Sequence, residues 1–96
     1  MPRQPCVYIL ASRRHGAIYT GVTNDLARRV WQHKRGEGSE FTRRYQIDKL
    51  VWMEPHDTMI EAIEREKQIK RWSKARRRGL IEVFNPEWCD LYPDLA

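Results

Sequence analysis

One carboxylate in the chain falls where a helical pattern expects an apolar residue. With Met59 set at 0° and a rotation of about 100° per residue, Glu66 falls at about 340°, inside the sector that holds Ala62 and Ile69. A buried, unpaired carboxylate costs several kcal/mol, so Glu66 needs a cation or a hydrogen-bonding partner. Lys70, four residues later, could supply an intrahelical ion pair. The alternative is a metal ligand or catalytic carboxylate in a functional site.

A second polar pair lies at the edge of an apolar stripe earlier in the chain. With Leu26 set at 0°, Arg29 falls at about 300° and His33 at about 340°, so the two share a helix face. In a purely structural interpretation, the arginine extends to solvent and the histidine is hydrogen-bonded in the core. In a functional one, a cationic stabiliser lies beside a group that can transfer protons.

Two tyrosines, Tyr8 and Tyr19, lie in short apolar segments that favour β-strands. The loop between these segments does not fix their register, so the sequence leaves open whether both rings share a sheet face. Paired strand tyrosines are usually core residues. Together with Arg29 and Glu66, however, they offer a phenolic base, a cationic stabiliser and a hard oxygen ligand. That set suits phosphodiester hydrolysis.

The elements that must position these residues are indicated by apolar runs, caps and breakers. Strands are predicted at Cys6–Ala11, Ala17–Val22 and about Asp48–Pro55, the first two forming an antiparallel hairpin. Helices are predicted from a cap at Thr23 or Asn24 to about Arg35, from a capping box at Thr58 to about Trp72, and from Ser73 to Phe84. The polar segment from Glu37 to Arg44 is predicted as a loop.

The order strand, strand, helix, strand, helix, helix predicts an α/β fold. Its centre is a three-stranded, mainly antiparallel sheet flanked by helices. Apolar side chains fall on both alternating faces of the strands, so helices should cover much of the sheet. The last helix is predicted to bury Leu80, Ile81 and Phe84. Core positions are also expected for Trp31, Trp72 and Trp88, although an exposed tryptophan could anchor a protein partner.

Length and charge narrow the class of protein. The chain has 96 residues, which suits one domain over residues 1–96, and its net charge of +5 favours a polyanionic partner such as nucleic acid. No apolar run approaches the roughly 20 residues of a membrane span, and the first residues lack the apolar stretch of a secretory signal. Cys6 and Cys89 form no metal or redox motif, although one long-range disulfide stays open. We therefore expect a cytoplasmic protein without membrane association.

At these spacings the sequence resembles the GIY-YIG nucleases. The family's first motif corresponds to Cys6-Val7-Tyr8 and its second to Tyr19-Thr20-Gly21. Arg29 matches the family's arginine on the first helix, and His33 matches a histidine that many members carry four residues later. Glu66 matches the metal-binding glutamate on the helix after the third strand. The likeness covers nearly the whole chain and is closest to the small, stand-alone bacterial branch.

The chain departs from the family pattern in two places. The first motif has Cys-Val in place of Gly-Ile, and the second has a threonine at its centre. Both tyrosines are retained, as is Gly21, where a side chain could obstruct backbone packing or substrate approach. Asn85 resembles a late asparagine of some members and is given a supporting role only.

The resemblance implies metal-dependent cleavage of a phosphodiester. Glu66 would hold one Mg²⁺ or Mn²⁺, with waters and phosphate oxygens completing the shell. Arg29 would neutralise charge on the phosphate. Tyr8 is the first choice to position or deprotonate the attacking water. Tyr19 and His33 would orient water and phosphate, and either could share the proton transfer.

A basic surface is expected to guide the nucleic acid. Basic residues crowd the end of the helix that carries Glu66 and the start of the next, namely Lys67, Lys70, Arg71, Lys74, Arg76, Arg77 and Arg78. Further phosphate contacts are expected from Arg13, Arg14, Arg43 and Arg44. Such a group supplies salt-dependent affinity without reading sequence.

Three functions fit this set of residues. The first is a metal-dependent endonuclease acting on nucleic acid, DNA in preference to RNA. The second is a nucleic-acid-binding module that keeps the nuclease fold without cutting. The third is a nuclease subunit that a protein partner delivers to damaged or branched DNA.

Overall fold

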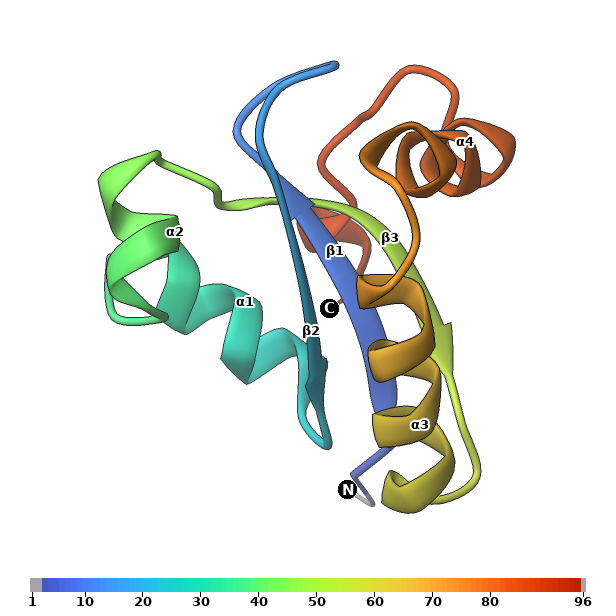
Figure 1. Ribbon diagram of the computed structural model, residues 1–96. Helices are drawn as coiled ribbons and strands as arrows, with labels where there is room; N and C mark the ends of the chain where they lie inside the picture. The colour runs from blue at the N-terminus through green and yellow to red at the C-terminus, as the bar shows by residue number, and fades with distance from the viewer. Residues whose placement is uncertain (1–2, 96) are drawn as a thin grey trace.

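The structure, a computed structural model, describes residues 3–95 and contains one three-stranded antiparallel sheet (Figure 1). The strands are β1 (Cys6–Ala11), β2 (Ile18–Thr23) and β3 (Lys49–Pro55), in the order β2-β1-β3. The helices are α1 (Leu26–Lys34), α2 (Glu40–Arg44), α3 (Met59–Lys70) and α4 (Lys74–Phe84), followed by the 3₁₀ helix η1 (Tyr92–Leu95). The predicted fold class is confirmed, with α2 as an added short helix.

The register of the hairpin settles how the two tyrosines are placed. Tyr8 in β1 lies opposite Gly21 in β2, and Leu10 lies opposite Tyr19. Since strand side chains alternate between faces, Tyr8 and Tyr19 project from the same face of the sheet. Because β2 is an edge strand, groups from both faces can meet beside it.

Helices cover the two faces of the sheet, and each face has its own apolar core. In Figure 1, α1 lies to one side of the sheet and α3 and α4 to the other. The α1 side buries Tyr8 and Leu10 with Val30, Ile47 and Leu50. The α3 and α4 side buries alternate residues of β1 with apolar residues of both helices, namely Val7, Ile9, Ala11, Ala62, Ile69 and Ile81. Burial on both faces explains why β1 is apolar along its whole length.

The helix starts agree with the predictions except for the first. Thr58 accepts a hydrogen bond from the backbone N–H of Glu61, and Ser73 caps α4 as predicted. The cap of α1 is Asp25 and not Thr23 or Asn24, because its carboxylate accepts from the backbone of the first turn. A negative cap also complements the positive end of the helix dipole. The helix that carries Glu66 ends at Lys70, two residues before the predicted end.

The prediction of a loop over residues 37–44 is wrong for its second half. Ser39 caps the short helix α2, where its side chain accepts from the backbone of Thr42 and Thr42 accepts from the backbone of Ser39. This reciprocal capping box has threonine at the position where the usual pattern has Glu or Gln. A five-residue helix also shows too little hydrophobic periodicity to be recognised from sequence.

Two apolar residues expected in the core are exposed. Trp31 lies on the flank of α1, where the guanidinium of Arg35 covers its ring at 4.7 Å from the centroid. Phe84 is the last residue of α4, which packs on the sheet through Ile81, so its side chain extends beyond the contact. Leu80 and Trp72 are partly buried and Trp88 is buried. No helix within residues 3–95 has the length and apolar character needed to cross a membrane.

Candidate active site

The centre of the candidate site is Tyr8, whose ring lies across Gly21 toward the edge of the sheet. A Cβ atom at Gly21 would lie 2.5 Å from both the Cζ and the hydroxyl of Tyr8, so no larger residue fits there without a shift. Tyr8 is only 1% exposed. Gly21 therefore belongs to the site through the space that it leaves for the phenol.

Tyr19 and His33 complete a triangle of rings with Tyr8. The ring centroids are 6.4 Å apart for Tyr8 and Tyr19, 6.0 Å for Tyr8 and His33, and 5.5 Å for Tyr19 and His33. The Tyr8 hydroxyl lies 3.2 Å from Nε2 of His33. The sequence could not fix this grouping, because it depends on the hairpin register and on how α1 packs against the sheet.

Two residues that the sequence did not single out support His33. Thr42 Oγ1 lies 3.1 Å from Nδ1 of His33, and Thr42 is buried. Gly38 packs against the same side of the ring, since a Cβ there would lie 2.0 Å from Nδ1. The one signal in the sequence is the Gly-Ser-x-x-Thr spacing of Gly38, Ser39 and Thr42, which could have indicated a capped turn.

Arg29 is held beside this triangle by its own helix and by the same glycine. Its Nη1 donates to the side chain of Gln32 at 3.1 Å, and its Nη2 donates to the carbonyl of Gly38 at 3.1 Å. The guanidinium is thus close enough to act on the charges of both Tyr8 and His33. Gly38 connects the arginine and the histidine, which α1 alone places one turn apart.

Burial keeps both central groups neutral near pH 7, and the charge of Arg29 adds to this effect for His33 alone. Burial raises the pKa of Tyr8 to about 12, although the nearby Arg29 opposes the rise. Burial, together with the charge of Arg29, lowers the pKa of His33 to about 4. The site therefore contains a neutral phenol hydrogen-bonded to a neutral imidazole.

Glu66 lies in α3, which packs against β1 and β2 on the face of the sheet opposite α1. Its carboxylate is near enough to Tyr8 to contribute to the raised pKa of that phenol, and its side chain is only 14% exposed. The inward direction predicted from the helical pattern is confirmed. Its Oε2 also lies 3.1 Å from Nζ of Lys70, so the predicted ion pair is present. The side chain of Lys70 is 48% exposed, so solvent screens the pair from the lysine side.

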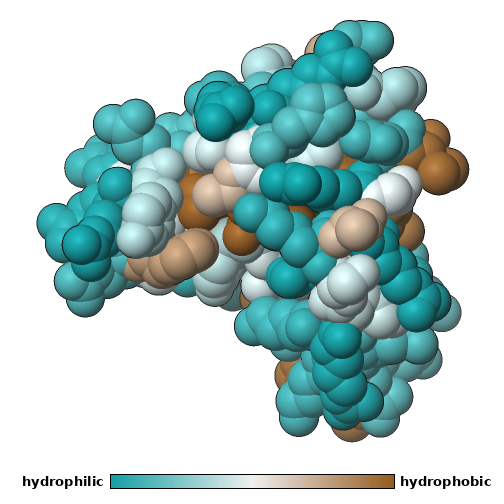
Figure 2. Space-filling view, turned by 45° about the horizontal axis from the view of Figure 1, so that its top comes forward, coloured by the Kyte–Doolittle hydropathy of each residue, from teal (hydrophilic) through white to brown (hydrophobic). Residues whose placement is uncertain are grey.

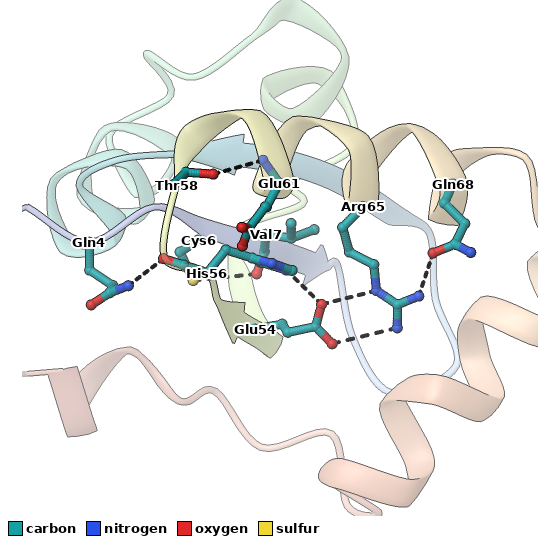
Figure 3. Close-up of polar contacts among 9 residues, drawn as sticks. All are labelled: Gln4, Cys6, Val7, Glu54, His56, Thr58, Glu61, Arg65 and Gln68. Atoms are coloured by element: carbon teal, nitrogen blue, oxygen red, sulfur yellow. Dashed lines mark hydrogen bonds and ion pairs between the residues drawn. The ribbon is translucent and has the colours of Figure 1, made fainter.

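Helix α3 is fixed in place by a polar network that precedes Glu66 by one residue (Figure 3). Arg65 Nε donates to Oε1 of Glu54 at 2.9 Å, and Nε2 of His56 lies 2.8 Å from the same oxygen. The Nη1 atom of Arg65 donates to Gln68 at 2.6 Å. Because Glu54 lies near the end of β3, this network ties the helix to the sheet and so sets the position of Glu66.

Arg29 and His33 line two separate pockets, and neither of these pockets is lined by Tyr8, Tyr19 or Glu66. Figure 2 shows a hollow between the lobe formed by α1 and α2 and the lobe formed by α3, on a surface that is mostly hydrophilic. Arg29 lines a small pocket of about 210 Å³ at the start of α1. His33 and Thr42 line a larger one of about 700 Å³, which also contains Arg13 and Arg43. Phosphate-sized groups therefore have room on both sides of the α1 residues.

The predicted basic residues differ in their exposure and contacts. The side chains of Lys67, Arg71 and Lys74 are exposed and make no hydrogen bond or ion pair with any residue between 3 and 95. Arg14 pairs with Glu87 at 3.0 Å, and Arg78 donates to the carbonyl of His15 at 3.0 Å. These contacts of Arg14 and Arg78 connect the hairpin loop to α4 and to the segment after α4.

Other basic residues of the predicted surface lie against aromatic rings or partly inside the protein. The guanidinium of Arg76 covers the ring of Trp72 at 3.9 Å, and that of Arg44 lies 5.7 Å from the ring of Tyr45. Arg77 is half-buried, whereas Arg13 and Arg43 are exposed. The exposed guanidiniums of Arg13, Arg43 and Arg71 are suited to phosphate contacts.

Asn85 lies apart from the triangle of rings. Its amide nitrogen donates to the carbonyls of Val51 and Cys89, and its oxygen accepts from the backbone N–H of Cys89. These contacts fasten the end of α4 to β3, which is a structural role. Cys89 is exposed and Cys6 is buried, and both are free thiols.

A single carboxylate suits a hard divalent ion that keeps most of its water. Among residues 3–95, no group of three or more His, Cys, Asp or Glu side chains is arranged to hold a metal ion. Mg²⁺ is often held by one or two carboxylates together with waters and substrate phosphates. Glu66 fits such an ion, because its carboxylate is largely buried, its charge acts on Tyr8, and its ion-pair partner within residues 3–95 is a half-exposed lysine.

The chain is similar in sequence or fold to proteins of three bacteria. A UPF0213 protein of Staphylococcus saprophyticus is 35% identical over 75 residues, which cover 78% of this chain and 90% of that protein. A UPF0213 protein of Staphylococcus aureus is 36% identical over 67 residues, which cover 70% of this chain and 82% of that one. The solution structure of the UPF0213 protein BH0048 of Bacillus halodurans matches with a TM-score of 0.52 and 31% identity, over 83% of this chain and 84% of that one.

The family model of the GIY-YIG catalytic domain matches residues 4–79. That range includes both tyrosine motifs, Arg29, His33 and Glu66. The resemblance stated from the sequence is thereby confirmed, and the chain belongs to the GIY-YIG family.

Proposed function

We propose that the protein is an endonuclease that hydrolyses phosphodiester bonds in DNA with one Mg²⁺ or Mn²⁺ ion. Membership of the GIY-YIG family indicates a nuclease. One observation carries the finer proposal: side chains from β1, β2, α1 and α3 gather at one edge of the sheet. They supply the acid–base pair, the cation and the carboxylate that phosphodiester hydrolysis requires.

In this proposal Tyr8 and His33 handle the proton of the attacking water. With a pKa of about 12, Tyr8 is a phenol at neutral pH, so it can take the proton of water only as its own proton leaves. The nearest acceptor is Nε2 of His33, 3.2 Å from the hydroxyl. A phosphate bound to Arg29 would neutralise one of the two causes of the low pKa of His33 and so favour the transfer.

Arg29 and Tyr19 hold the phosphate in this proposal. The planar, permanently charged guanidinium of Arg29 can bind two non-bridging oxygens and stabilise the charge that grows on them. Tyr19 is half-buried beside Tyr8 and offers a hydroxyl to the water or the phosphate. Glu66 would hold the divalent ion, which when bound polarises the phosphate and stabilises the leaving oxygen.

The nucleic acid is proposed to lie across the hollow between the two lobes. Exposed cations stand on the α3 and α4 side, among them Lys67, Arg71 and Lys74, and on the other side at Arg13 and Arg43. Their contacts are with phosphates, so affinity should fall steeply with salt and depend little on sequence. A protein partner could still direct the enzyme to a particular DNA structure.

The proposal is tested with purified protein on plasmid, single-stranded, branched and RNA substrates, with Mg²⁺, Mn²⁺ or chelator. We expect metal-dependent cutting of DNA, and a fall on the order of 100-fold or more for Glu66→Gln. The matched control is Glu64→Gln, an exposed carboxylate two residues earlier on the same helix, which should cut like wild type. Lys70→Met removes the ion-pair partner of Glu66 and also one cation of the predicted basic surface. Because that surface binds phosphates, we expect a higher KM without loss of turnover.

Three results would contradict the proposal. Equal cutting by the Glu66→Gln variant would exclude the carboxylate from the chemistry. Salt-sensitive binding of DNA without any cutting would identify a nucleic-acid-binding module instead. Cutting that appears only when a cellular extract is added would identify a subunit that depends on a partner.

A further inference from the structure

Thr42 is a buried residue whose hydroxyl contacts the candidate site. It is 2% exposed, and its Oγ1 lies 3.1 Å from Nδ1 of His33. The other ring nitrogen of His33 lies 3.2 Å from the hydroxyl of Tyr8. Thr42, His33 and Tyr8 therefore form one continuous hydrogen-bonded chain that runs from α2 to β1.

The direction of this chain depends on where the Thr42 hydroxyl hydrogen goes. Thr42 Oγ1 donates to the carbonyl of Ser39, which cannot donate in return. Its lone pairs are then free to accept from the backbone N–H of Ser39 and from Nδ1–H of His33. A hydroxyl has one hydrogen and two acceptor sites, so these three contacts fill it, and Ser39 Oγ, 3.0 Å from the same Oγ1, competes with Nδ1–H for the second acceptor site.

A neutral imidazole carries one N–H, so a hydrogen on Nδ1 leaves Nε2 as an acceptor. The Tyr8 hydroxyl must then donate to Nε2, which directs its hydrogen away from the substrate and leaves its lone pairs free. Gly38 keeps the ring in this position, because its backbone is packed against Nδ1 with no room for a side chain. The opposite tautomer would place an N–H against the Tyr8 oxygen and occupy one of those lone pairs.

We propose that Thr42 is a positioning residue that holds His33 in the tautomer with hydrogen on Nδ1, so that the Tyr8 oxygen is free to accept a hydrogen from the attacking water. The role rests on the proposed nuclease function, but the tautomer itself can be measured in the resting protein. It assigns a purpose to helix α2, whose cap residue Ser39 receives the Thr42 hydrogen.

The test combines ¹⁵N NMR of the His33 ring with steady-state kinetics on a DNA substrate. In the wild-type protein at pH 7, Nδ1 should give the shift of a protonated nitrogen and Nε2 that of an unprotonated one. Thr42→Val keeps the shape but removes the acceptor, so the tautomer should shift toward hydrogen on Nε2. The value of kcat should fall about tenfold with little change in KM, whereas Thr42→Ser should restore both the tautomer and kcat.

Ser39→Ala separates this role from a loss of the helix cap. It removes the side chain that caps α2, together with its contact to Thr42 Oγ1, but leaves the backbone carbonyl that receives the Thr42 hydrogen. We expect lower stability with the wild-type tautomer and kcat. An unchanged tautomer in Thr42→Val, or an equal loss of kcat in Ser39→Ala, would overturn the proposal. If wild-type protein cuts nothing, the nuclease function fails, and the NMR shifts alone still decide whether Thr42 sets the tautomer.

Discussion

At the scale of single residues, Gly21 shows how an absent side chain can shape a site. The Tyr8 ring occupies the space that a Cβ at Gly21 would fill. The sequence pointed to this residue through its place in the second tyrosine motif, but not to its partner. The partner follows from the register, which pairs Gly21 with Tyr8 across the hairpin.

Replacing Gly21 with alanine should therefore displace Tyr8. We expect Gly21→Ala to lower the free energy of unfolding by about 1–3 kcal/mol and to reduce cleavage, because Tyr8 is too tightly enclosed to move freely. The matched control is Gly79→Ala in α4, where the new methyl meets nothing within 4 Å and should add about 0.5–1 kcal/mol of stability. Chemical denaturation measures both, and equal stability of Gly21→Ala and wild type would contradict the packing described above.

At the scale of elements, α3 is positioned by contacts on the side away from Tyr8. The bonds from Arg65 to Glu54 fasten the helix to β3, and Arg65 also lies over the ring of Trp72 at 5.2 Å. The sequence predicted α3 from its cap and periodicity, yet it gave no sign of this network. Arg65 and Glu54 lie on different elements, and only the packing of the helix on the sheet brings them together.

Arg65→Leu should loosen this helix. We expect a loss of about 1–2 kcal/mol of stability, because a charge-assisted, partly buried hydrogen bond is removed and Glu54 is left with fewer partners. Cleavage should fall as well, since Glu66 is the next residue. Lys67→Leu, an exposed cation on the same helix, should leave stability within about 0.5 kcal/mol of wild type. Similar denaturation midpoints for the two variants would show that the network does not hold α3.

At the scale of the whole molecule, Asp90 joins three distant parts of the chain. Its carboxylate accepts from Nζ of Lys34 in α1 at 2.6 Å, from the backbone N–H of Leu50 in β3 and from that of Tyr92. Burial opposes ionisation, but these hydrogen bonds prevail and hold the pKa of Asp90 below its usual value. The ionised carboxylate therefore stabilises the folded state.

This contribution has a defined dependence on pH. The stabilisation by Asp90 is present above the pKa of an unfolded aspartate, about 3.9. It is lost as the pH falls through the lower pKa that Asp90 has in the folded state. Asp90→Asn should cost about 1–3 kcal/mol at pH 7, and its difference from wild type should shrink below about pH 4. Asp94→Asn is the control, since Asp94 is exposed in η1. A difference between Asp90→Asn and wild type that is the same at pH 3 and pH 7 would contradict the assignment.

Local patterns within the sequence were sufficient for the strands, the three longer helices and the inward direction of Glu66. Alternation, caps and periodicity act over a few neighbouring residues, and so does the ion pair of Glu66 with Lys70. The spacing of the tyrosines, Arg29, His33 and Glu66 was likewise enough to indicate the family.

Tertiary structure alone decided which of these groups meet. The hairpin register placed Tyr8 over Gly21, the packing of α1 brought His33 to Tyr8, and the short helix α2 brought Thr42 to His33. Each of these contacts joins residues on different elements, and its geometry depends on the packing of the intervening chain. Local propensity holds no information about such packing. For this reason the sequence did not indicate Thr42 and Gly38 as site residues, and their segment was predicted as a loop.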